Sequence, residues 1–453
     1  MEKISIIGMG YVGTAMATLI ASSKLGNSYR YFVNGIEQNN KNGIKISREI
    51  NSGIIPIQTN DKNFKQKFLH ATKKEKNFIC SNSIKNIKGS KIVIVSINCD
   101  LKNKKNPNVN LNQFLNSIEE ILLNIDKNSL LIIESTIPPG TCEKKIIPLI
   151  KKITKKRKIN NEDIKLAYTY ERVMPGENYL NSIKNYWKVM SGINRKSTNE
   201  CKKFLKSIIN TKKFPLTILK NIRSCEFGKI LENSYRSINI ALIEEWSRFA
   251  ESINIDIYEI IEAIRLRPTH SNIRHPGFGV GGYCLTKDPL FGVYAAKKIW
   301  KKKLDFVFSR LAMKINDQMP LESLKKIKKI FNNNVKNKKI LILGMSYKEN
   351  VGDLRFSPSI YFAKKCVQLK SKVYWHDPFV KSIPVNSVTK VDSIKNLSGF
   401  DLVLFAVKHD LYNKLKFDIR LNNTIFFDAN YVLTKKQLNK IENKKIIFHS
   451  IGR

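Results

Sequence analysis

A glycine-rich segment at residues 277–288, GFGVGGYCLTKD, contains the side chain best suited to covalent chemistry, the thiol of Cys284. Four of its first six residues are glycine, which permits sharp turns and a close approach of the backbone to a bound molecule. Residues 288–302 predict a helix, with Asp288 as the N-cap and Pro289 at the first position. A thiol near the positive end of a helix favours its nucleophilic thiolate form. The alternative is a glycine-rich turn that contains a cysteine by chance.

A reactive thiolate needs partners, and a long helix predicted at residues 225–252 supplies candidates in Lys229 and Asn233. Their spacing of four residues places both side chains on one face of the helix. They could form a solvated face, or they could direct an ammonium and an amide at one oxygen, which is how an oxyanion is stabilised. A helix of this length is also a natural place for two subunits to pair. The apolar stripe expected to pack this helix comprises Phe227, Ile230, Leu231, Ile238 and Leu242.

A glycine motif, GMGYVG at residues 8–13, follows a short strand predicted at 3–7 and precedes a predicted helix. This order is the dinucleotide fingerprint, in which glycines make the tight turn and the helix N-terminus faces the pyrophosphate. A second predicted strand, 31–36, ends before Glu37, which can bind the ribose hydroxyls and disfavours a 2′-phosphate. The pattern predicts NAD as the cofactor rather than NADP. Its cofactor-binding residues are Gly8, Gly10, Tyr11, Val12, Gly13 and Glu37.

Two loops follow predicted strands farther along the chain and carry polar side chains. The strand at 130–133 leads into a hydroxyl-rich loop with Thr136, and the segment 165–177 carries Glu171 and Arg172. Strands alternate with helical segments here, as a doubly wound parallel sheet requires, and ligands bind at the carboxyl edge of such a sheet. Taken singly, each loop is more simply explained as an ordinary turn.

A second α/β unit is predicted in the last third of the chain. Strands are predicted at 338–344, 373–377 and 402–407, but the first turn lacks the GxGxxG pattern. We therefore do not expect a second dinucleotide in this unit. Lys348 and Arg355 follow this turn, and both side chains suit contacts with phosphate or carboxylate groups.

Length and cysteine usage place the chain among globular proteins of a reducing compartment. Its 453 residues are enough for two or three domains with separate cores. The first residues show no signal-peptide pattern, and no run approaches the roughly 18 apolar residues of a membrane span. The seven cysteines are scattered without a CxxC pair, which argues against disulfides and a zinc site. We expect a cytoplasmic location, no membrane insertion and no bound metal.

The net charge of +43, from 80 basic and 37 acidic residues, would permit binding to nucleic acid or another polyanion. The excess is mostly lysine, spread along the whole chain together with abundant asparagine and isoleucine. No helix-turn-helix and no basic segment interleaved with aromatic residues accompanies it. We interpret the charge as compositional bias that helps to attract a phosphorylated substrate, with no specific nucleic acid partner. A polyanion-binding protein is the alternative.

Several separated motifs together resemble the UDP-glucose/GDP-mannose dehydrogenase family over nearly the whole chain. They occur in the family's order and at its spacing, so the set is specific although each motif is modest alone. The matching motifs are GMGYVG, ESTIPPGT, YERVMPGE, KILENSYRSINIAL, GFGVGGYCLTKDP, AMKINDQMP, SYKENVGDLRFSP and WHDP.

The resemblance implies an α/β fold with two Rossmann-like doubly wound domains joined by a central helical domain with a long helix. The expected parts are an NAD-binding Rossmann domain at 1–195, a central domain at 196–325 and a C-terminal Rossmann-like domain at 326–453. The central domain would carry the catalytic lysine and cysteine and would pair two chains into a homodimer through its long helix. The C-terminal domain would hold the nucleotide-sugar.

The resemblance also implies a reaction, the NAD-dependent four-electron oxidation of the C6 hydroxymethyl group of a UDP-sugar to a carboxylate. Cys284 falls on the family's nucleophile, which passes through a thiohemiacetal and a thioester. Lys229 and Asn233 fall on positions that stabilise oxyanions, and Asp288 falls on one that assists water or proton movement.

Further positions carry over from the family's motifs. Thr136 matches a catalytic position that contacts the bound water or the cofactor, and Arg355 matches one near the nucleotide or cofactor. Glu171 is the only matched carboxylate in the loop that provides general acid–base catalysis in the family. The substrate-binding residues implied by the resemblance are Glu171, Arg172, Lys229, Asn233, Gly279, Gly281 and Lys348.

Departures from the family's pattern bear on the identity of the sugar. Pro175 stands where members acting on UDP-glucose carry a second glutamate. The segments ERVMPG and GVGG are more similar to the branch that oxidises UDP-N-acetylhexosamines, whereas YCLTKD is closer to the UDP-glucose members. We expect a UDP-N-acetylhexosamine 6-dehydrogenase of surface polysaccharide synthesis. UDP-glucose 6-dehydrogenase is the first alternative, and a non-catalytic protein that binds NAD and a nucleotide-sugar is the second.

Overall fold

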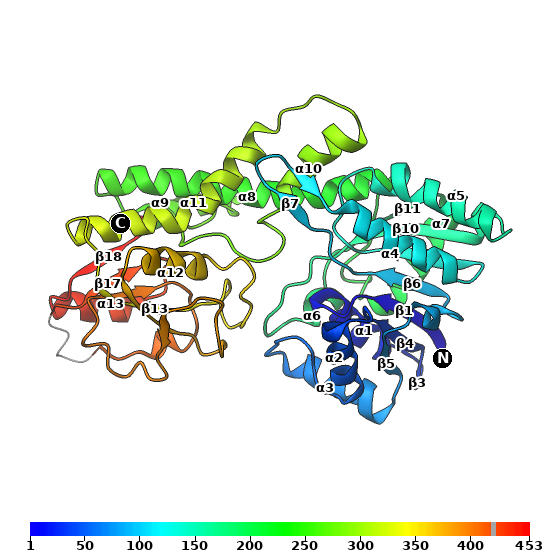
Figure 1. Ribbon diagram of the computed structural model, residues 1–453, viewed down its shortest axis with the longest axis horizontal. Coiled ribbons are helices and arrows are strands. Elements are labelled where there is room, and N and C mark those ends of the chain that lie inside the picture. The colour runs from blue at the N-terminus through cyan, green and yellow to red at the C-terminus, as the bar shows by residue number, and fades with distance from the viewer. Residues whose placement is uncertain (418–422) are drawn as a thin grey trace. The chain divides into compact units, whose positions relative to one another are not determined.

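The computed structural model describes residues 1–417 and 423–453, which form two compact units. The first unit comprises Met1–Glu232 and Leu290–Asp305, and the second comprises Asn233–Pro289 and Phe306–Arg453. Each unit is built around one large twisted sheet with helices on its faces (Figure 1). Among these residues no helix is long and apolar enough to cross a bilayer. The division into three domains stays a prediction.

The first unit contains an eight-stranded sheet in the order β12-β11-β10-β9-β6-β1-β4-β5. All neighbours from β5 to β10 are parallel, whereas β11 runs antiparallel to β10. Counted along the chain, the parallel strands follow the order 3-2-1-4-5-6, which confirms the predicted doubly wound sheet. The strands are β1 (Glu2–Ile7), β4 (Tyr31–Ile36), β5 (Phe78–Ser81), β6 (Ile92–Val95), β9 (Ser129–Ile133), β10 (Ile164–Tyr170), β11 (Val189–Gly192) and β12 (Thr217–Ile218).

Alternation along the strands buries both faces of this sheet. In β6, Ile92 and Ile94 belong to one apolar core, and Val93 and Val95 belong to the other. The helices that cover the first core are α1 (Tyr11–Ala21), α2 (Lys41–Asn51), α3 (Lys62–Leu69), α6 (Asn181–Lys184) and α7 (Arg195–Ile208). Those that cover the second are α4 (Leu111–Asn124) and α5 (Ile147–Lys156). Two short hairpins pair β2 (Lys24–Leu25) with β3 (Ser28–Tyr29) and β7 (Leu101–Asn103) with β8 (Asn108–Val109).

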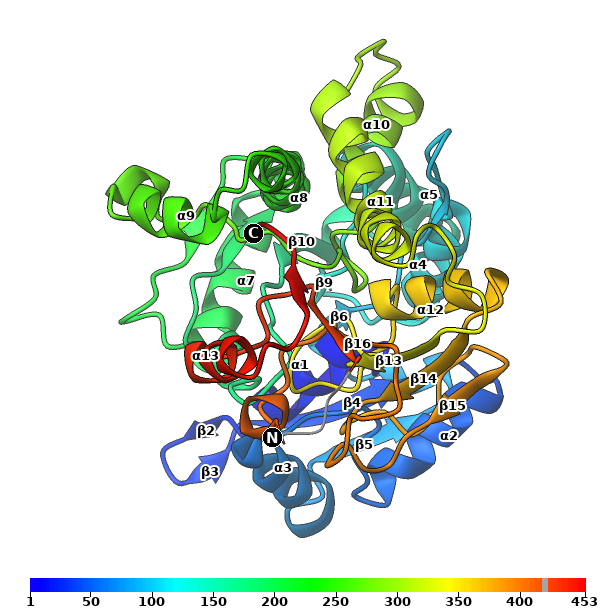
Figure 2. The same ribbon diagram turned by 90° about the vertical axis from the view of Figure 1, so that its left-hand side faces the viewer.

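Helix α8 (Ile222–Ser252) is one long helix, which Figure 1 shows lengthwise and Figure 2 nearly end on. The prediction that its apolar stripe is packed is wrong for Phe227, Leu231 and Leu242, which are 55%, 57% and 49% exposed. The physical reason is that small and polar residues form the buried face. Ser237, for example, accepts hydrogen bonds from the Asn316 amide at 2.9 Å on Oγ and at 3.1 Å on its carbonyl oxygen. The buried residues include Lys229, Asn233, Ser237, Ala241, Glu244 and Ser247.

The second unit contains six parallel strands in the order β15-β14-β13-β16-β17-β18, within the ranges that the structure describes. This order is again 3-2-1-4-5-6, so the predicted second α/β unit is confirmed. The strands are β13 (Lys339–Leu343), β14 (Lys372–His376), β15 (Val388–Lys390), β16 (Leu402–Phe405), β17 (Ile425–Asp428) and β18 (Phe448–Ser450). The helices are α9 (Ile257–Arg265), α11 (Val307–Ile330), α12 (Pro358–Gln368) and α13 (Lys435–Asn443).

The helix predicted at 288–302 is shorter than expected. Helix α10 (Pro289–Tyr294) begins at the predicted proline but passes into a π-helical turn at Ala295–Ile299. This wider turn precedes Trp300, whose indole N–H donates to the Pro139 carbonyl oxygen at 2.8 Å. A tertiary contact that the sequence pattern does not encode thus coincides with the end of the helix.

Candidate functional site

A cavity of about 740 Å³ lies at the carboxyl edge of the first unit's sheet. It is bounded by the loops after β1, β4 and β6 and by one face of α4, the place where a doubly wound sheet binds its ligand. Its lining includes Gly8, Gly10, Glu37, Ser96 and Gln113. The predicted dinucleotide motif therefore opens onto a cavity large enough for a cofactor.

The three glycines of this motif have different surroundings. Gly8 has a left-handed backbone with φ of +91°, and a Cβ there would lie 2.9 Å from the Ser96 carbonyl oxygen. A Cβ on Gly13 would lie 1.8 Å from the Gly8 carbonyl oxygen, so α1 can pack on this turn only with glycine. A Cβ on Gly10 would meet none of the described atoms within 4 Å. Gly10 therefore leaves open space at the start of α1, where helix N–H groups can bind a pyrophosphate.

Glu37 follows β4 and stands where the ribose of a dinucleotide is bound. Its carboxylate accepts the Met9 N–H at 2.5 Å, which fixes its orientation at the edge of the cavity. Tyr11 and Val12 begin α1, and the Tyr11 carbonyl accepts a hydrogen bond from the Tyr179 hydroxyl. The glycine cradle and the carboxylate together fit NAD, and an acidic group at this place repels the additional phosphate of NADP.

A buried ammonium joins two loops at the same edge of the sheet. Glu134 directly follows β9, Glu171 directly follows β10, and Lys188 directly precedes β11. The Lys188 Nζ lies 2.6 Å from Glu134 Oε1 and 2.5 Å from Glu171 Oε2. The three side chains, which we call the Lys188 triad, are 4%, 2% and 7% exposed for Lys188, Glu134 and Glu171. Sequence reasoning selected Glu171 but missed Lys188 and Glu134, whose one signal is a charge immediately beside an apolar strand.

Burial and neighbouring charges determine the protonation of the Lys188 triad. Burial raises the pKa of the Glu134 carboxyl, an effect that Lys188 opposes and Glu171 reinforces. Burial alone would lower the pKa of Lys188, but the two carboxylates raise it above its ordinary value. Lys188 is therefore charged at neutral pH and compensates the negative charge that these two buried carboxylates share.

Helix α8 fastens the loop after β10 from another side. Lys229 donates from Nζ to the Glu171 carbonyl oxygen at 2.8 Å, and this ammonium lies 5.6 Å from the centre of the Tyr170 ring. Glu232 accepts hydrogen bonds from Arg172 Nε at 3.0 Å and Nη2 at 2.7 Å. The structure thus brings two predicted residues, Lys229 and Glu171, into contact. The Arg172 guanidinium, predicted to bind substrate, is engaged by a carboxylate of the chain itself.

Thr136 lies half-buried in the loop between β9 and the π-helical turn Cys142–Ile146. Glu226 of α8 holds this loop, because its carboxylate accepts the Gly140 N–H at 2.6 Å and the Cys142 N–H at 2.8 Å. Burial raises the pKa of Glu226 to about 7, against the opposing effect of these hydrogen bonds. Sequence reasoning missed Glu226, which is an acid on the buried face of a predicted helix.

In the second unit, the thiol of Cys284 is exposed on the turn that leads into α10. The Cys284 carbonyl accepts the Asp288 N–H at 2.9 Å, so this turn is helical in form. The buried Asp288 carboxylate accepts from Asn233 Nδ2 at 2.7 Å on one oxygen and from Lys287 Nζ at 2.7 Å on the other. Two predicted site residues, Asn233 and Asp288, are therefore in direct contact. Lys287 is a further partner that sequence reasoning missed.

The glycines before Cys284 are required by packing within the second unit. A Cβ on Gly281 would lie 2.4 Å from the Cβ of Tyr347, and Gly279 is confined in a similar way. Gly282 has φ of +79°, and its N–H donates to the Arg355 carbonyl at 2.9 Å. The observed close approach at these glycines is therefore made by the chain itself. Contact of Gly279 and Gly281 with a sugar stays a prediction.

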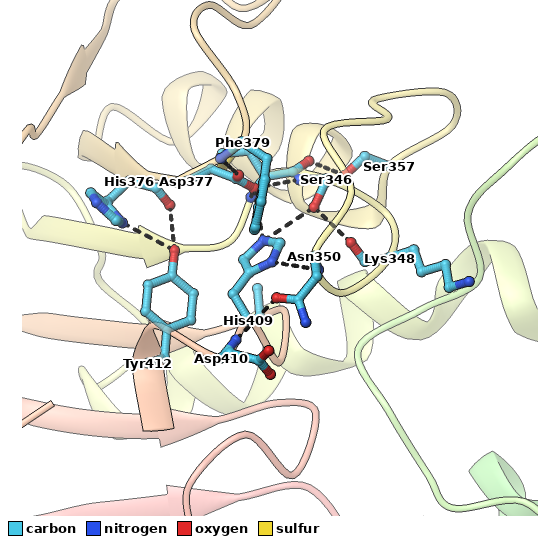
Figure 3. Close-up of polar contacts among 12 residues, drawn as sticks. Ser346, Lys348, Asn350, Ser357, His376, Asp377, Phe379, His409, Asp410 and Tyr412 are labelled. Atoms are coloured by element: carbon cyan, nitrogen blue, oxygen red, sulfur yellow. Dashed lines mark hydrogen bonds and ion pairs between the residues drawn. The ribbon is translucent and has the colours of Figure 1, made fainter. Parts of the chain in front are cut away.

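Lys348 extends from a turn that a buried polar cluster holds in place, and its side chain points away from that cluster (Figure 3). The Nε2 of the buried His409 lies 3.1 Å from Asp377 Oδ2 and 3.2 Å from Ser346 Oγ. The His409 Nδ1 accepts the Asn350 N–H at 2.9 Å, which leaves Nε2 as the ring nitrogen that faces Asp377 and Ser346. Burial lowers the pKa of Lys348. An anionic ligand would offset this cost, which suits the predicted substrate contact.

The predicted catalytic and substrate residues belong to two groups, and the structure describes each group by itself. Arg355 forms a bidentate ion pair with Asp353, donating from Nε to Oδ1 at 3.0 Å and from Nη2 to Oδ2 at 2.5 Å. In the part of the chain that the structure describes, no group of three or more side chains could hold a metal ion. The assembly of the two groups into one site stays a prediction. The first unit contains Thr136, Glu171, Arg172 and Lys229, and the second contains Asn233, Gly279, Gly281, Cys284, Asp288, Lys348 and Arg355.

Three family models match the chain in sequence order. The NAD binding domain of the UDP-glucose/GDP-mannose dehydrogenase family matches residues 2–209, and its central domain matches residues 223–318. The UDP binding domain of the same family matches residues 341–435. The matches cover most of the chain.

Individual proteins are similar over the full length. A UDP-N-acetyl-D-mannosamine dehydrogenase from Methanocaldococcus jannaschii is 30% identical, over 97% of this chain and 94% of its own. The solved structure of a UDP-D-ManNAc dehydrogenase from Pyrococcus horikoshii has a TM-score of 0.82 at 26% identity, covering 100% of this chain and 99% of that one. A UDP-glucose dehydrogenase from Pyrobaculum islandicum has a TM-score of 0.83 at 19% identity, over 100% and 98% of the two chains. The last likeness concerns the fold alone.

Alanine at Gly10 and at Gly13 is expected to have separable effects. Gly13→Ala forces a methyl group against the backbone, and overpacking of this kind costs about 1–3 kcal/mol, which lowers the midpoint of thermal unfolding. Gly10→Ala places the methyl group in open space, so unfolding stays as in the wild type, while the Kd for NAD measured by calorimetry rises on the order of tenfold. Unchanged NAD affinity in Gly10→Ala would contradict the assignment of Gly10 to the cofactor site.

Proposed function

Since the chain belongs to the UDP-glucose/GDP-mannose dehydrogenase family, we propose that it oxidises the C6 hydroxymethyl group of a UDP-N-acetylhexosamine to a carboxylate. The enzyme is an NAD-dependent nucleotide-sugar dehydrogenase. The match to a UDP binding domain and the relatives named UDP-N-acetyl-D-mannosamine dehydrogenase support this choice of sugar. The segment ERVMPG, with Pro175 in place of a second glutamate, supports it as well.

The observation that carries the proposal is the exposure of Cys284. All seven cysteines lie within the described part of the chain, and six of them are buried while Cys284 is exposed. Burial raises the pKa of Cys142, Cys201 and Cys225, so these thiols are protonated as well as shielded. Cys284 is the thiol that an aldehyde can reach, and the same turn ends at the buried carboxylate of Asp288.

Oxidation of the alcohol to a carboxylate removes four electrons and takes its second oxygen from water. The first step removes a hydride from C6 and a proton from its hydroxyl, which leaves an aldehyde. The Cys284 thiolate adds to the aldehyde carbon, and the carbonyl oxygen takes up a proton to give a thiohemiacetal. Loss of a second hydride and of that proton gives a thioester. Water then releases the carboxylate, the thiolate and two protons.

The cofactor's chemistry is the acceptance of both hydrides, so two NADH form for each sugar that is oxidised. Gly8, Gly10, Tyr11, Val12 and Gly13 would hold the pyrophosphate side of NAD at the start of α1. Glu37 would bind the ribose hydroxyls. This part of the proposal follows from the cavity and the glycine cradle of the first unit.

Fixed donors are assigned to the oxygens that become negative during these steps. Lys229 supplies an ammonium and Asn233 an amide, one turn apart on α8. Asp288 accepts from Asn233 and Lys287, which orients the amide, and it is assigned to guide the hydrolytic water or its proton. Thr136 is assigned to the bound water or the cofactor.

Recognition of the nucleotide-sugar is assigned to residues of both units. The half-buried ammonium of Lys348 suits a phosphate oxygen, and Arg355 suits the nucleotide or the cofactor. Glu171 is assigned to the sugar, with a supporting acid–base role. The remaining assigned residues are Arg172, Gly279 and Gly281.

UDP-glucose is the alternative substrate, favoured by the segment YCLTKD around Cys284. A non-catalytic role has less support, because Cys284, Lys229 and Asn233 are all present. The product of the proposed reaction is a UDP-hexuronic acid, and we assign it to the synthesis of a surface polysaccharide from cytoplasmic precursors.

A side-by-side assay of UDP-GlcNAc, UDP-ManNAc, UDP-GalNAc and UDP-glucose tests the reaction and the sugar. We expect the highest kcat/KM with a UDP-N-acetylhexosamine, and two NADH for each uronate detected by mass spectrometry. A ratio of one NADH per sugar would identify a simple alcohol dehydrogenase. A higher kcat/KM with UDP-glucose would overturn the choice of sugar and leave the four-electron chemistry standing.

Cys284→Ser is expected to abolish uronate formation, because a hydroxyl is a far weaker nucleophile at neutral pH and forms no thioester. The expected loss in kcat is on the order of a thousandfold or more, measured as uronate formed per enzyme. Cys366→Ala removes a buried thiol of α12 and serves as the matched control, with wild-type kcat. A Cys284→Ser enzyme that forms uronate at a normal rate would rule out the covalent route.

We also infer a homodimer formed through α8. Four large apolar side chains of this helix, and that of Ile253 directly after its last residue, are between 48% and 55% exposed. Their spacing of seven, four, three and four residues aligns them in one stripe, and an apolar surface of this kind on a long helix marks a protein contact. A second copy of the chain offers the same stripe, as a two-fold interface requires. The residues are Tyr235, Leu242, Trp246, Phe249 and Ile253.

Two charges in this stripe are expected to separate the subunits. Leu242→Glu combined with Trp246→Glu should convert a dimer into a monomer in light scattering coupled to gel filtration, because the two carboxylates would be buried unpaired at the interface. Ile447→Glu, at a site that is 53% exposed, directly precedes β18 and is not part of the stripe, should leave the dimer intact. A monomeric wild type at micromolar concentration would contradict the inference.

A further inference from the structure

The buried ammonium of Lys188 lies between the two loops that carry Thr136 and Glu171. The chemistry described above gives it no part. It is bonded to Glu134 at 2.6 Å and to Glu171 at 2.5 Å, and its side chain is 4% exposed. A lysine of this kind carries a large desolvation cost, which is a reason to ask what its contacts determine.

The sheet explains why these three residues meet. Ile133 pairs with Tyr168 in the parallel β9–β10 ladder, and Tyr170 pairs with Val189 in the antiparallel β10–β11 ladder. The residues immediately beyond these pairs, Glu134, Glu171 and Lys188, therefore reach the same edge. The backbone hydrogen bonds between the strands end here and loops begin. The Lys188 ammonium links these loops through its bonds to the Glu134 and Glu171 side chains.

The remaining bonds of the two carboxylates extend this link in both directions. Glu134 Oε2 accepts from the hydroxyl of Ser96, a residue that lines the predicted NAD cavity. Glu171 Oε1 accepts the Arg172 N–H, and the Glu171 carbonyl receives the Lys229 ammonium at 2.8 Å. One connected series of bonds therefore runs from the cavity wall through Lys188 to the ammonium of α8.

We propose that Lys188 is a positioning residue for the oxidation. By holding Glu134 and Glu171 together, it fixes the loop that begins with Glu134 and carries Thr136. It also fixes the Glu171 carbonyl oxygen, which accepts the hydrogen bond from Lys229. This inference depends on the proposed function, since it takes Thr136 and Lys229 to act on the substrate. Lys188 itself acts through its two neighbours.

Removal of the ammonium would leave two buried carboxylates facing each other. Because each is bonded to the same Nζ, their oxygens lie within about 5 Å of one another. Two like charges this close in a dry site do not both ionise, so one carboxyl keeps a proton or the loops separate. As pH rises that proton is lost, and the repulsion grows.

Few other charges face the triad. Burial raises the pKa of Cys201 to about 12 and also raises that of Cys225, so neither thiol is charged at neutral pH. The positive charges around the triad are those of Lys229 and Arg172, and Arg172 is paired with the Glu232 carboxylate. The ionisable groups around the triad are Cys201 of α7, Cys225 and Lys229 of α8, Tyr170 of β10 and Arg172 of the following loop.

The test is Lys188→Met, which keeps the length of the side chain and removes its charge. We expect kcat for uronate formation to fall on the order of a hundredfold, as a misplacement of catalytic groups by about 1 Å can cause. The Kd for NAD should change less than about threefold. The loss should deepen as pH rises, a change of the pH–rate profile that a lower stability alone does not produce.

A second substitution separates the charge from the loss of packing. The double variant Lys188→Met with Glu134→Gln replaces one of the two facing carboxylates by a neutral amide. This amide can donate a hydrogen bond to Glu171. We expect the pH–rate profile to return to the wild-type shape and kcat to recover on the order of tenfold over the single variant. A double variant as slow and as dependent on pH as Lys188→Met would overturn the role assigned to the ammonium.

Lys165→Met is the matched control. Lys165 lies on the same strand, β10, but near its amino end, is 7% exposed, and bonds to Glu200 at 2.6 Å and to the Asn128 carbonyl at 2.8 Å. Its loss should lower the thermal midpoint as much as Lys188→Met does, with wild-type kcat and pH–rate profile. If Lys188→Met behaves in the same way, Lys188 serves stability alone and the inference is wrong. If instead the wild type forms no uronate from any of the four sugars, the proposed function fails, and this role fails with it.

Discussion

One buried carboxylate satisfies two backbone N–H groups of a loop, and the functional edge of the first unit depends on this contact. Glu226 of α8 accepts from Gly140 and Cys142, groups that would otherwise be buried without partners. The contact fixes the rotation of α8 about its axis. Lys229 then faces the Glu171 carbonyl, and Glu232 meets Arg172, because residues three and four apart share a face. One helix, fixed in its rotation, therefore holds both the loop after β9 and the loop after β10 in place.

The elements around the dinucleotide motif were predictable because their signals are local. A buried strand, a glycine turn, a helix and an acid after the next strand follow one another within the first 37 residues, and the structure contains each of them. The Lys188 triad was not predictable in the same way. Glu134 and Lys188 are 54 residues apart, and their pairing requires knowledge that β9, β10 and β11 are neighbours and that β11 is antiparallel.

Periodicity predicted that α8 is a helix but misassigned its buried face. A stripe of large apolar side chains normally marks the packed side, yet Phe227, Leu231 and Leu242 are exposed while Lys229 and Asn233 are buried. The chain can bury the polar pair because neighbouring groups satisfy both, Lys229 through the Glu171 carbonyl and Asn233 through Asp288. The glycines before Cys284 were likewise predicted correctly in position but not in cause. The sequence indicates that the backbone at Gly281 lies close to another group, and the structure shows that this group is Tyr347 of the chain itself.

The distribution of the cysteines determines how this protein reacts with alkylating reagents. Burial raises the pKa of five of the seven thiols, and a sixth, Cys99, is buried as well. An iodoacetamide probe therefore encounters one accessible thiol per folded chain. Alkylation of the native protein would count folded molecules one by one, and any thiol label beyond the first would report unfolding. The number of labelled thiols per chain therefore measures how much of the protein is folded.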